Sequence, residues 1–218
     1  MQPEFWQERW RTAQIGFHQS AVDRRLQAYW SKLNLSADSR VFVPLCGKSL
    51  DLLWLRERGH TVLGVELSPV AVEAFCMQNG IPAMRRSLGD FDAFEADRLA
   101  LYRGDFFKLT SALLGDVSAV YDRAALISWA PDLRQAYVEH IIALTRRGAQ
   151  TLLIAVEYPQ SQMSGPPFPV TSRDVDTLYS KHHTIEQLAR HEILDLEPRL
   201  IARGLTELHE VSYRLTRL

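Results

Sequence analysis

The tripeptide Gly47-Lys48-Ser49 directly follows an apolar run, as in the last part of a phosphate-binding loop. A Walker A loop also needs a glycine five residues before the glycine of Gly-Lys-Ser, because the loop wraps its backbone amides around the phosphates. Here that position is Phe42, and no glycine lies between Phe42 and Gly47. The sequence therefore argues against a nucleotide triphosphatase.

Gly47 also lacks the other glycines of the dinucleotide fingerprint, so a close approach of the backbone to a pyrophosphate is not expected. An acid, Glu66, ends the next expected strand, where it could accept hydrogen bonds from both hydroxyls of a ribose. A further acid, Asp105, follows the third strand, where it could meet an adenine edge. A glycine turn, a ribose acid and an adenine acid without a phosphate cradle indicate S-adenosylmethionine rather than NAD or ATP.

Each of these residues also has a purely structural interpretation. Gly47 could form a tight strand-to-helix turn, and Glu66 could be a solvated strand end. Asp105 could cap the turn at 106–110. Their order on successive strands favours the ligand site over three unrelated structural roles.

The elements that must position these residues alternate between strand and helix. Strands are expected at 40–45, 61–67, 99–105, 118–124, 149–158 and 184–194, with an edge strand in 204–218. Helices are expected at 20–33 with Ser20 as N-cap, 49–59, 68–80 with Ser68 as N-cap, 131–146 and 172–180. This alternation predicts one doubly wound α/β domain with a mostly parallel sheet, whose ligands bind beyond the carboxyl ends of the strands. The Pro-, Ser- and Gly-rich loop 159–169 is expected to be a mobile lid.

The composition is that of an ordinary soluble globular protein. The chain has 218 residues, is 46% hydrophobic and 23% charged, and carries a formal net charge of -1. We therefore expect no nucleic-acid partner, and without a long apolar run no membrane partner. Cys46 and Cys76 cannot form a disulfide framework, and no Cys/His set has zinc spacing. These features predict a cytoplasmic protein without a metal, and we expect a monomer.

Several segments resemble the thiopurine S-methyltransferase family, in particular its shorter bacterial members. The matching pieces are FWQERW and GFHQ near the N-terminus, then VPLCGKSLDLLWL, GHTVLGVELS, GDFF and YDRAAL. The resemblance runs along essentially the whole chain. It implies a single class I, Rossmann-like methyltransferase domain over 1–218, with an N-terminal helical cover over about residues 1–35. It also implies a seven-stranded, mostly parallel sheet whose last strand is antiparallel.

The resemblance implies methyl transfer from S-adenosylmethionine to the sulfur of small aromatic and heterocyclic thiols, thiopurines among them, with S-adenosylhomocysteine as product. Bacterial relatives are also associated with methylation of selenium and tellurium compounds and with tellurite resistance. The donor half of the sequence carries no information about the acceptor, so a methyltransferase for another small oxygen or nitrogen nucleophile is an alternative. A non-catalytic sensor of S-adenosylmethionine is the alternative from a different class.

The resemblance also assigns roles to individual residues. Arg123 would lie beside the sulfur centre, touching both donor and acceptor, where a guanidinium would favour the thiolate form; its structural alternative is a salt bridge to Asp122 or Asp132. Arg199 would contact the acceptor. Asp23 could line the acceptor side if its helix covers the site, or could belong to a solvated helix face. The implied donor contacts are Trp6, Trp10, Phe17, Leu45, Gly47, Glu66, Gly104, Asp105 and Phe106.

Overall fold

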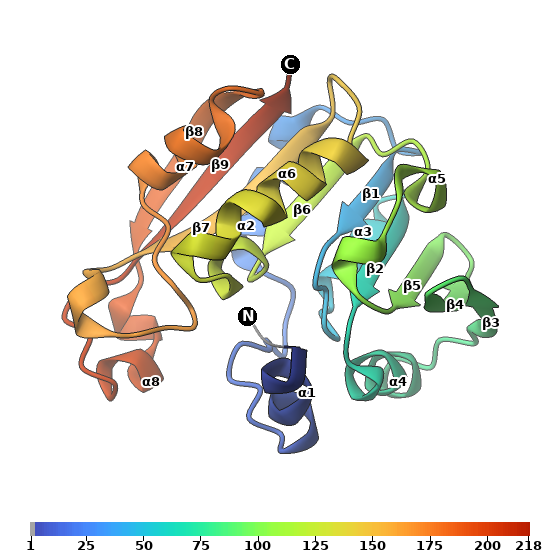
Figure 1. Ribbon diagram of the computed structural model, residues 1–218, viewed down its shortest axis with the longest axis horizontal. Coiled ribbons are helices and arrows are strands. Elements are labelled where there is room, and N and C mark those ends of the chain that lie inside the picture. Colours follow the sequence, from blue (N-terminus) through green and yellow to red (C-terminus); the bar gives the residue numbers. More distant parts are fainter. Residues whose placement is uncertain (1–2) are drawn as a thin grey trace.

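Nine strands form one sheet in the order β3-β4-β5-β2-β1-β6-β7-β9-β8 (Figure 1). The computed structural model describes residues 3–218. The strands are β1 (Arg40–Val43), β2 (Thr61–Glu66), β3 (Met84–Leu88), β4 (Phe91–Ala96), β5 (Leu99–Arg103), β6 (Ala119–Arg123), β7 (Gln150–Glu157), β8 (His183–Glu192) and β9 (His209–Arg217). The predicted α/β class with a mostly parallel central sheet is confirmed.

The centre of the sheet is parallel, from β5 through β2, β1 and β6 to β7. The expected antiparallel strand near the C-terminus is β9, which pairs with β7 on one side and with β8 on the other. The prediction that this strand is an edge strand is therefore wrong. Its apolar residues Val211, Tyr213 and Leu215 alternate with the polar residues Ser212 and Arg214, although Ser212 is also buried. Such alternation shows which side chains share one face of the sheet, and it carries no information about which edges of the strand are paired.

The hairpin β3–β4 raises the strand count from the expected seven to nine. The sequence did not predict β3, because MRRSL has neither apolar alternation nor burial. Ion pairs across the hairpin join Arg85 to Asp92 and Arg86 to Glu95. The remaining strands, β5 to β8 in sheet order, make up the seven that were expected.

Helices cover both faces of the sheet (Figure 1). One core cluster joins the sheet to α6 (Arg134–Leu144) and α7 (Ser172–Tyr179). The other joins it to α2 (Arg24–Tyr29), the 3-10 turn η1 (Trp30–Leu33), α3 (Asp51–Glu57) and α4 (Pro69–Gln78). Three further helices are α1 (Pro3–Arg11), α5 (Ser111–Leu114) and α8 (Pro198–Ile201). None of the helices between residues 3 and 218 is both long and apolar enough to cross a bilayer.

The N-terminal boundary of α2 differs from the expectation, and the difference bears on the site. Ser20 does not cap this helix; Asp23 does, and its carboxylate accepts hydrogen bonds from the amides of Arg25 and Leu26. Aspartate and serine are about equally good N-caps, so the local sequence does not choose between them. The cap at Ser68 is confirmed, because its side chain accepts from the Ala71 amide.

Candidate active site

A cavity of about 950 Å³ lies along the carboxyl ends of the parallel strands. Its wall includes residues that follow or end β1, β2, β5, β6 and β7. The N-terminal segment, the loop around 165–167 and the segment 193–210 complete it. This is the place where a doubly wound sheet binds its ligands, and the volume is near the upper end for small-molecule sites.

The turn after β1 is built from left-handed backbone. Leu45 has φ +47° and Gly47 has φ +55°, a conformation that costs a residue with a side chain about 1–2 kcal/mol. A Cβ on Gly47 would also lie 3.0 Å from the indole ring of Trp10. Gly47 is thus required by its backbone angle and by the ring that covers it, which is more than a tight turn alone would need.

Glu66 holds the ends of β1 and β2 together. One of its carboxylate oxygens accepts from the Gly47 amide at 2.9 Å, and the other accepts from the Ser68 amide at 2.7 Å. Only 6% of the residue is exposed, so its reading as a solvated strand end is wrong. Burial raises its pKa, while these backbone hydrogen bonds act in the opposite direction. The carboxylate also forms part of the cavity wall.

The N-terminal aromatic residues lie together on the wall of the cavity. Phe17 contacts Trp6 and Trp10 edge to face, with ring centroids 5.4 and 5.6 Å apart. Figure 1 shows that α1, which carries both tryptophans, lies below the sheet rather than against either of its faces. The three rings therefore cover one end of the cavity.

The segment after β5 combines a structural and a wall-forming role. Asp105 accepts from the Phe107 amide at 3.0 Å, so it is a cap, and it also lines the cavity with Phe106. Gly104 is not part of the wall. A Cβ on Gly104 would lie 2.5 Å from the ring of Phe91, which explains the glycine by packing.

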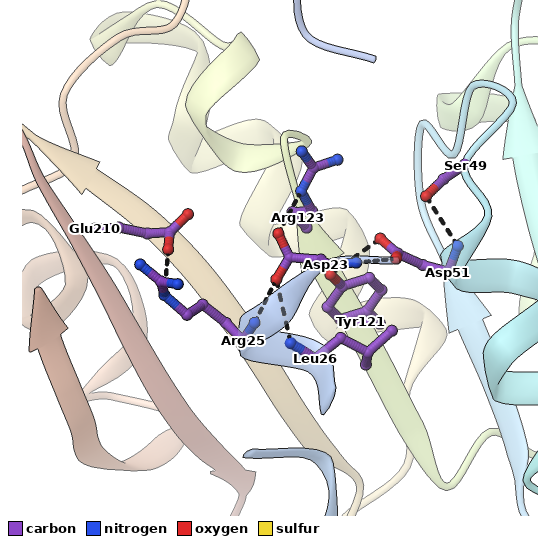
Figure 2. Close-up of polar contacts among 8 residues, drawn as sticks. All are labelled: Asp23, Arg25, Leu26, Ser49, Asp51, Tyr121, Arg123 and Glu210. Atoms are coloured by element: carbon purple, nitrogen blue, oxygen red, sulfur yellow. Dashed lines mark hydrogen bonds and ion pairs between the residues drawn. The ribbon is translucent and has the colours of Figure 1, made fainter. Parts of the chain in front are cut away.

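Arg123 ends β6 and lines the cavity, and its partner is Asp23 (Figure 2). Its Nε donates to Oδ2 of Asp23 at 3.1 Å. The predicted alternatives, Asp122 and Asp132, are not its partners. Asp122 points to the other face of the strand, where it accepts from the Tyr137 hydroxyl at 2.7 Å.

Asp23 lies behind the wall rather than on it, with 4% of the residue exposed. The reading of Asp23 as part of a solvated helix face is therefore wrong. Its backbone amide donates to Asp51 at 2.8 Å, and the hydroxyl of Tyr121 donates to the other oxygen of Asp51 at 3.1 Å (Figure 2). Burial raises the pKa of Asp51. Burial also acts to lower the pKa of Arg123, but Tyr121 and the acids around Arg123 raise it, and the net result is a raised pKa of Arg123.

Three residues of this network were missed by the sequence reasoning: Asp51, Tyr121 and Glu210. Asp51 follows the glycine turn within the segment GKSLD, which was a usable signal. Glu210 ends no recognisable motif, yet it lines the cavity and pairs with Arg25 (Figure 2). Its position depends on the pairing of β9 with β7, and no local sequence pattern predicts this pairing.

Two further predictions concern the far wall of the cavity. Arg199 does line it, and its guanidinium reaches the N-terminal segment, where a Cβ on Gly16 would lie 2.8 Å from Nη1. The loop predicted to be a lid forms wall at 165–167, and hydrogen bonds anchor it. The Pro167 carbonyl accepts from the Tyr158 hydroxyl at 2.6 Å, and the Pro169 carbonyl accepts from the guanidinium of Arg134 at 2.7 Å.

Comparisons with known proteins identify the family of this chain. The family model described as "Thiopurine S-methyltransferase (TPMT)" matches residues 1–218. The thiopurine S-methyltransferase of Nitrosospira multiformis is 46% identical over 216 residues, covering 99% of this chain and 98% of the relative. That of Shewanella oneidensis is 41% identical over 217 residues and is covered completely.

Solved structures show the same fold at low sequence identity. A Burkholderia thailandensis 1,6-didemethyltoxoflavin-N1-methyltransferase with bound S-adenosylhomocysteine superposes with a TM-score of 0.64 at 17% identity, covering 98% of this chain and 87% of that chain. An S-adenosylmethionine-dependent methyltransferase from Methanosarcina mazei has a TM-score of 0.62 at 14% identity, with 90% and 99% covered. The sheet is therefore that of an α/β S-adenosylmethionine-dependent methyltransferase.

Proposed function

The chain belongs to the thiopurine S-methyltransferase family and is an S-adenosylmethionine-dependent methyltransferase, and from this we propose that it methylates the sulfur of aromatic and heterocyclic thiols, thiopurines among them. The family supports the donor, and its relatives' names support the acceptor. In this proposal the whole chain acts as one methyltransferase domain. The monomeric state and the cytoplasmic location expected from the sequence stay predictions.

The strand order supports a division of the cavity into two halves. From β1 the chain adds β2 and β5 on one side of the sheet, and β6 and β7 lie on the other side of β1. The switch point of the sheet therefore lies between β1 and β6. Gly47 follows β1, Glu66 ends β2 and Asp105 follows β5, all on one side of it. Arg123 ends β6 on the other side. We assign the first side to the donor and the second to the acceptor.

The residues of the first side fit the donor. Two left-handed residues, Leu45 and Gly47, shape a turn with no room for a Cβ at Gly47, and Glu66 is a buried acid on the wall. When bound, S-adenosylmethionine supplies a sulfonium methyl group with a good leaving group already in place. The aromatic cover excludes water, and together these residues orient the reaction; holding two reactants in line can contribute roughly 7–11 kcal/mol.

Arg123 is the residue that we place beside the reacting sulfur of the acceptor. Its Nε is held by Asp23, and neither Nη donates to another protein group within residues 3–218. A guanidinium fixed at one nitrogen and open at the other two can donate to a thiolate or to a neighbouring ring nitrogen. Since the acids around it keep Arg123 charged, it would favour negative charge on the acceptor sulfur.

The single observation that carries the proposal is this charged, anchored Arg123 on the cavity wall, across the switch point from the glycine turn. The test is transfer of labelled methyl from S-adenosylmethionine to 6-mercaptopurine, with a catechol and selenite run in parallel. We expect label on the thiopurine sulfur, and methylated selenium would extend the proposal to the selenium and tellurium compounds and to tellurite resistance. Label on the catechol alone would overturn the acceptor chemistry, and donor binding without transfer to any acceptor would indicate a sensor.

A further inference from the structure

Glu210, on β9, is a second charged residue on the acceptor side of the cavity. One of its carboxylate oxygens pairs with the guanidinium of Arg25 (Figure 2). The other oxygen accepts no hydrogen bond from any residue between 3 and 218. The side chain is 14% exposed, so this free oxygen belongs to a carboxylate that the protein largely shields from solvent.

The first turn of α2 holds Glu210 and Arg123 at the same time. The carboxylate of Asp23 fixes Nε of Arg123, and the side chain of Arg25, two residues later, fixes one oxygen of Glu210. The same Asp23 carboxylate accepts from the Arg25 amide at 2.8 Å, which ties the two anchors to one another. Figure 2 shows the two anchored side chains on either side of this turn. Their relative position is therefore set by one short piece of backbone.

The two anchored side chains lie on opposite sides of β7. Arg123 on β6 is in register with Ile154, Glu210 on β9 is in register with Val156, and both β7 residues line the cavity. Neighbouring strands lie about 4.8 Å apart, so β6 and β9 are separated by roughly 10 Å. A flat acceptor lying over Ile154 and Val156 would meet a hydrogen-bond donor at one edge and an acceptor at the other.

This pairing fits one chemical form of the proposed substrate class. A heterocyclic thiol whose sulfur is next to a ring nitrogen can exist as the neutral thione, with the proton on nitrogen and a carbon–sulfur double bond. When such a sulfur is methylated, the ring nitrogen must lose its proton. A fixed guanidinium at the sulfur and a carboxylate at the N–H would recognise this form and remove that proton.

We propose that Glu210 accepts the ring N–H proton of a neutral thione acceptor during methyl transfer. The inference rests on the proposed function. The π pair of the carbon–sulfur double bond forms the new sulfur–methyl bond as the methyl–sulfonium bond of the donor breaks, and the pair of that broken bond leaves with the donor sulfur. The N–H electron pair becomes the ring C=N bond, and the proton moves to the free oxygen of Glu210. Atoms and charge balance without an additional reactant.

The surroundings of Glu210 are compatible with this role. Burial raises its pKa, and Asp23 acts in the same direction, whereas Arg25, Arg123 and Arg24 lower it. His191 faces Glu210 from β8, where the two residues are partners in the sheet register. A carboxylate with a raised pKa is a stronger base than one in water.

His18 is the competing base on the same wall. Burial lowers its pKa, and Lys48 and Arg123 lower it further. A lower pKa makes the imidazole a weaker acceptor for the thione proton. We choose Glu210 rather than His18 because the strand register sets Glu210 opposite Arg123 across β7.

The test compares two acceptors in the wild-type enzyme and in variants. One acceptor is 6-mercaptopurine, which offers a thione N–H, and the other is 4-nitrothiophenol, which has no N–H and is already a thiolate at neutral pH. General-base catalysis contributes typically 10²–10⁴-fold. We expect the ratio of kcat for 6-mercaptopurine to kcat for 4-nitrothiophenol to fall about 100-fold in Glu210→Gln.

Two control variants separate this role from a structural one. Arg25→Gln breaks the same ion pair but keeps the carboxylate, so its ratio should stay at least about tenfold above that of Glu210→Gln if proton transfer carries the effect. An equal fall of the ratio in both variants, or an unchanged ratio in Glu210→Gln, would overturn the proposal. So would a fall of the ratio in His18→Gln alone. A wild-type enzyme inactive on both thiols would instead contradict the proposed function itself.

Discussion

Nε of Arg123 donates to Oδ2 of Asp23 at 3.1 Å, although 100 residues separate the two in the chain. Asp23 is at the same time the N-cap of α2. One carboxylate therefore begins a helix and orients the arginine that we place beside the acceptor. This shared role allows the two functions to be separated by substitution.

Asp23→Asn should keep the cap and weaken the hold on Arg123. Asparagine caps a helix as well as aspartate does. When its one oxygen accepts from the cap amides, its NH2 group faces Nε of Arg123 and cannot accept from it. We expect kcat/KM for the thiol acceptor to fall at least about tenfold while the Kd for S-adenosylmethionine stays within about twofold, since a hydrogen bond to a charged group contributes about 1.5–3 kcal/mol. Steady-state kinetics and donor titration measure the two quantities.

Asp23→Ala is the matched comparison, because it removes the cap as well. It should lower the free energy of unfolding by about 1 kcal/mol more than Asp23→Asn does. Equal kinetic parameters for Asp23→Asn and the wild type would show that Asp23 serves the helix alone.

Gly47→Ala should weaken donor binding specifically. The substitution puts a Cβ 3.0 Å from the Trp10 ring and forces alanine into left-handed backbone, which costs about 1–2 kcal/mol. We expect the Kd for S-adenosylmethionine to rise about 5- to 30-fold, measured by calorimetry.

Gly80→Ala is the control for backbone strain. Gly80 has φ +60°, and a Cβ there would meet nothing within 4 Å. This variant should lose stability without a change in donor affinity. If both glycine variants lower donor affinity equally, the turn after β1 is not a donor contact.

The carboxyl group of Asp122 should leave a signature in the pH dependence of stability. Burial raises its pKa from the ordinary 3.8 to about 6, although hydrogen bonds from the Leu126 amide and the Tyr137 hydroxyl act against this. Between pH 3.8 and about pH 6, Asp122 is therefore protonated in the folded protein and ionised in the unfolded chain. Its contribution to stability is complete below pH 3.8 and is lost as the pH rises to about 6.

Asp122→Asn removes this contribution. Relative to the wild type, its free energy of unfolding should rise more steeply with pH across that window, by up to about 1.4 kcal/mol per pH unit. Urea denaturation at several pH values measures the slope. Parallel profiles for the two proteins would contradict a raised pKa for Asp122.

His183 should change the pH dependence of stability with the opposite sign to that of Asp122. It is 4% exposed, and burial lowers its pKa from 6.5 to about 4. As the pH falls, His183 takes up a proton in the unfolded chain before it does so in the folded protein. Its contribution to the free energy of unfolding is therefore complete above pH 6.5 and is lost as the pH falls to about 4. His183→Phe, which can keep the edge contact with Tyr179, should make the unfolding profile less steep in this window. An unchanged slope would show that His183 titrates normally.

Much of the fold was predictable because its signals are local. The apolar strands at the centre of the sheet, the cap at Ser68 and the glycine turn at Gly47 can all be read from short stretches. The positions of Gly47, Glu66 and Asp105 at the cavity then follow, because parallel strands bring their carboxyl ends to one edge.

The acceptor side was harder to predict because it depends on pairings between distant segments. Nothing local links Asp23 to Arg123, and an aspartate in the segment VDRR looks like part of a charged helix face. Glu210 reaches the cavity because β9 inserts between β7 and β8. Strand β3 was missed for a related reason, since ion pairs to β4 replace the apolar alternation that marks a strand.

The most direct test of the account is the methylation of 6-mercaptopurine by Arg123→Ala, with donor affinity measured on the same preparation. Hydrogen bonds to charged groups contribute about 1.5–3 kcal/mol, so kcat/KM for the thiol should fall about 10- to 100-fold. The Kd for S-adenosylmethionine should stay within about threefold, because we place the donor on the other side of the switch point. An equal loss of donor affinity and acceptor turnover would contradict the assignment of Arg123 to the acceptor.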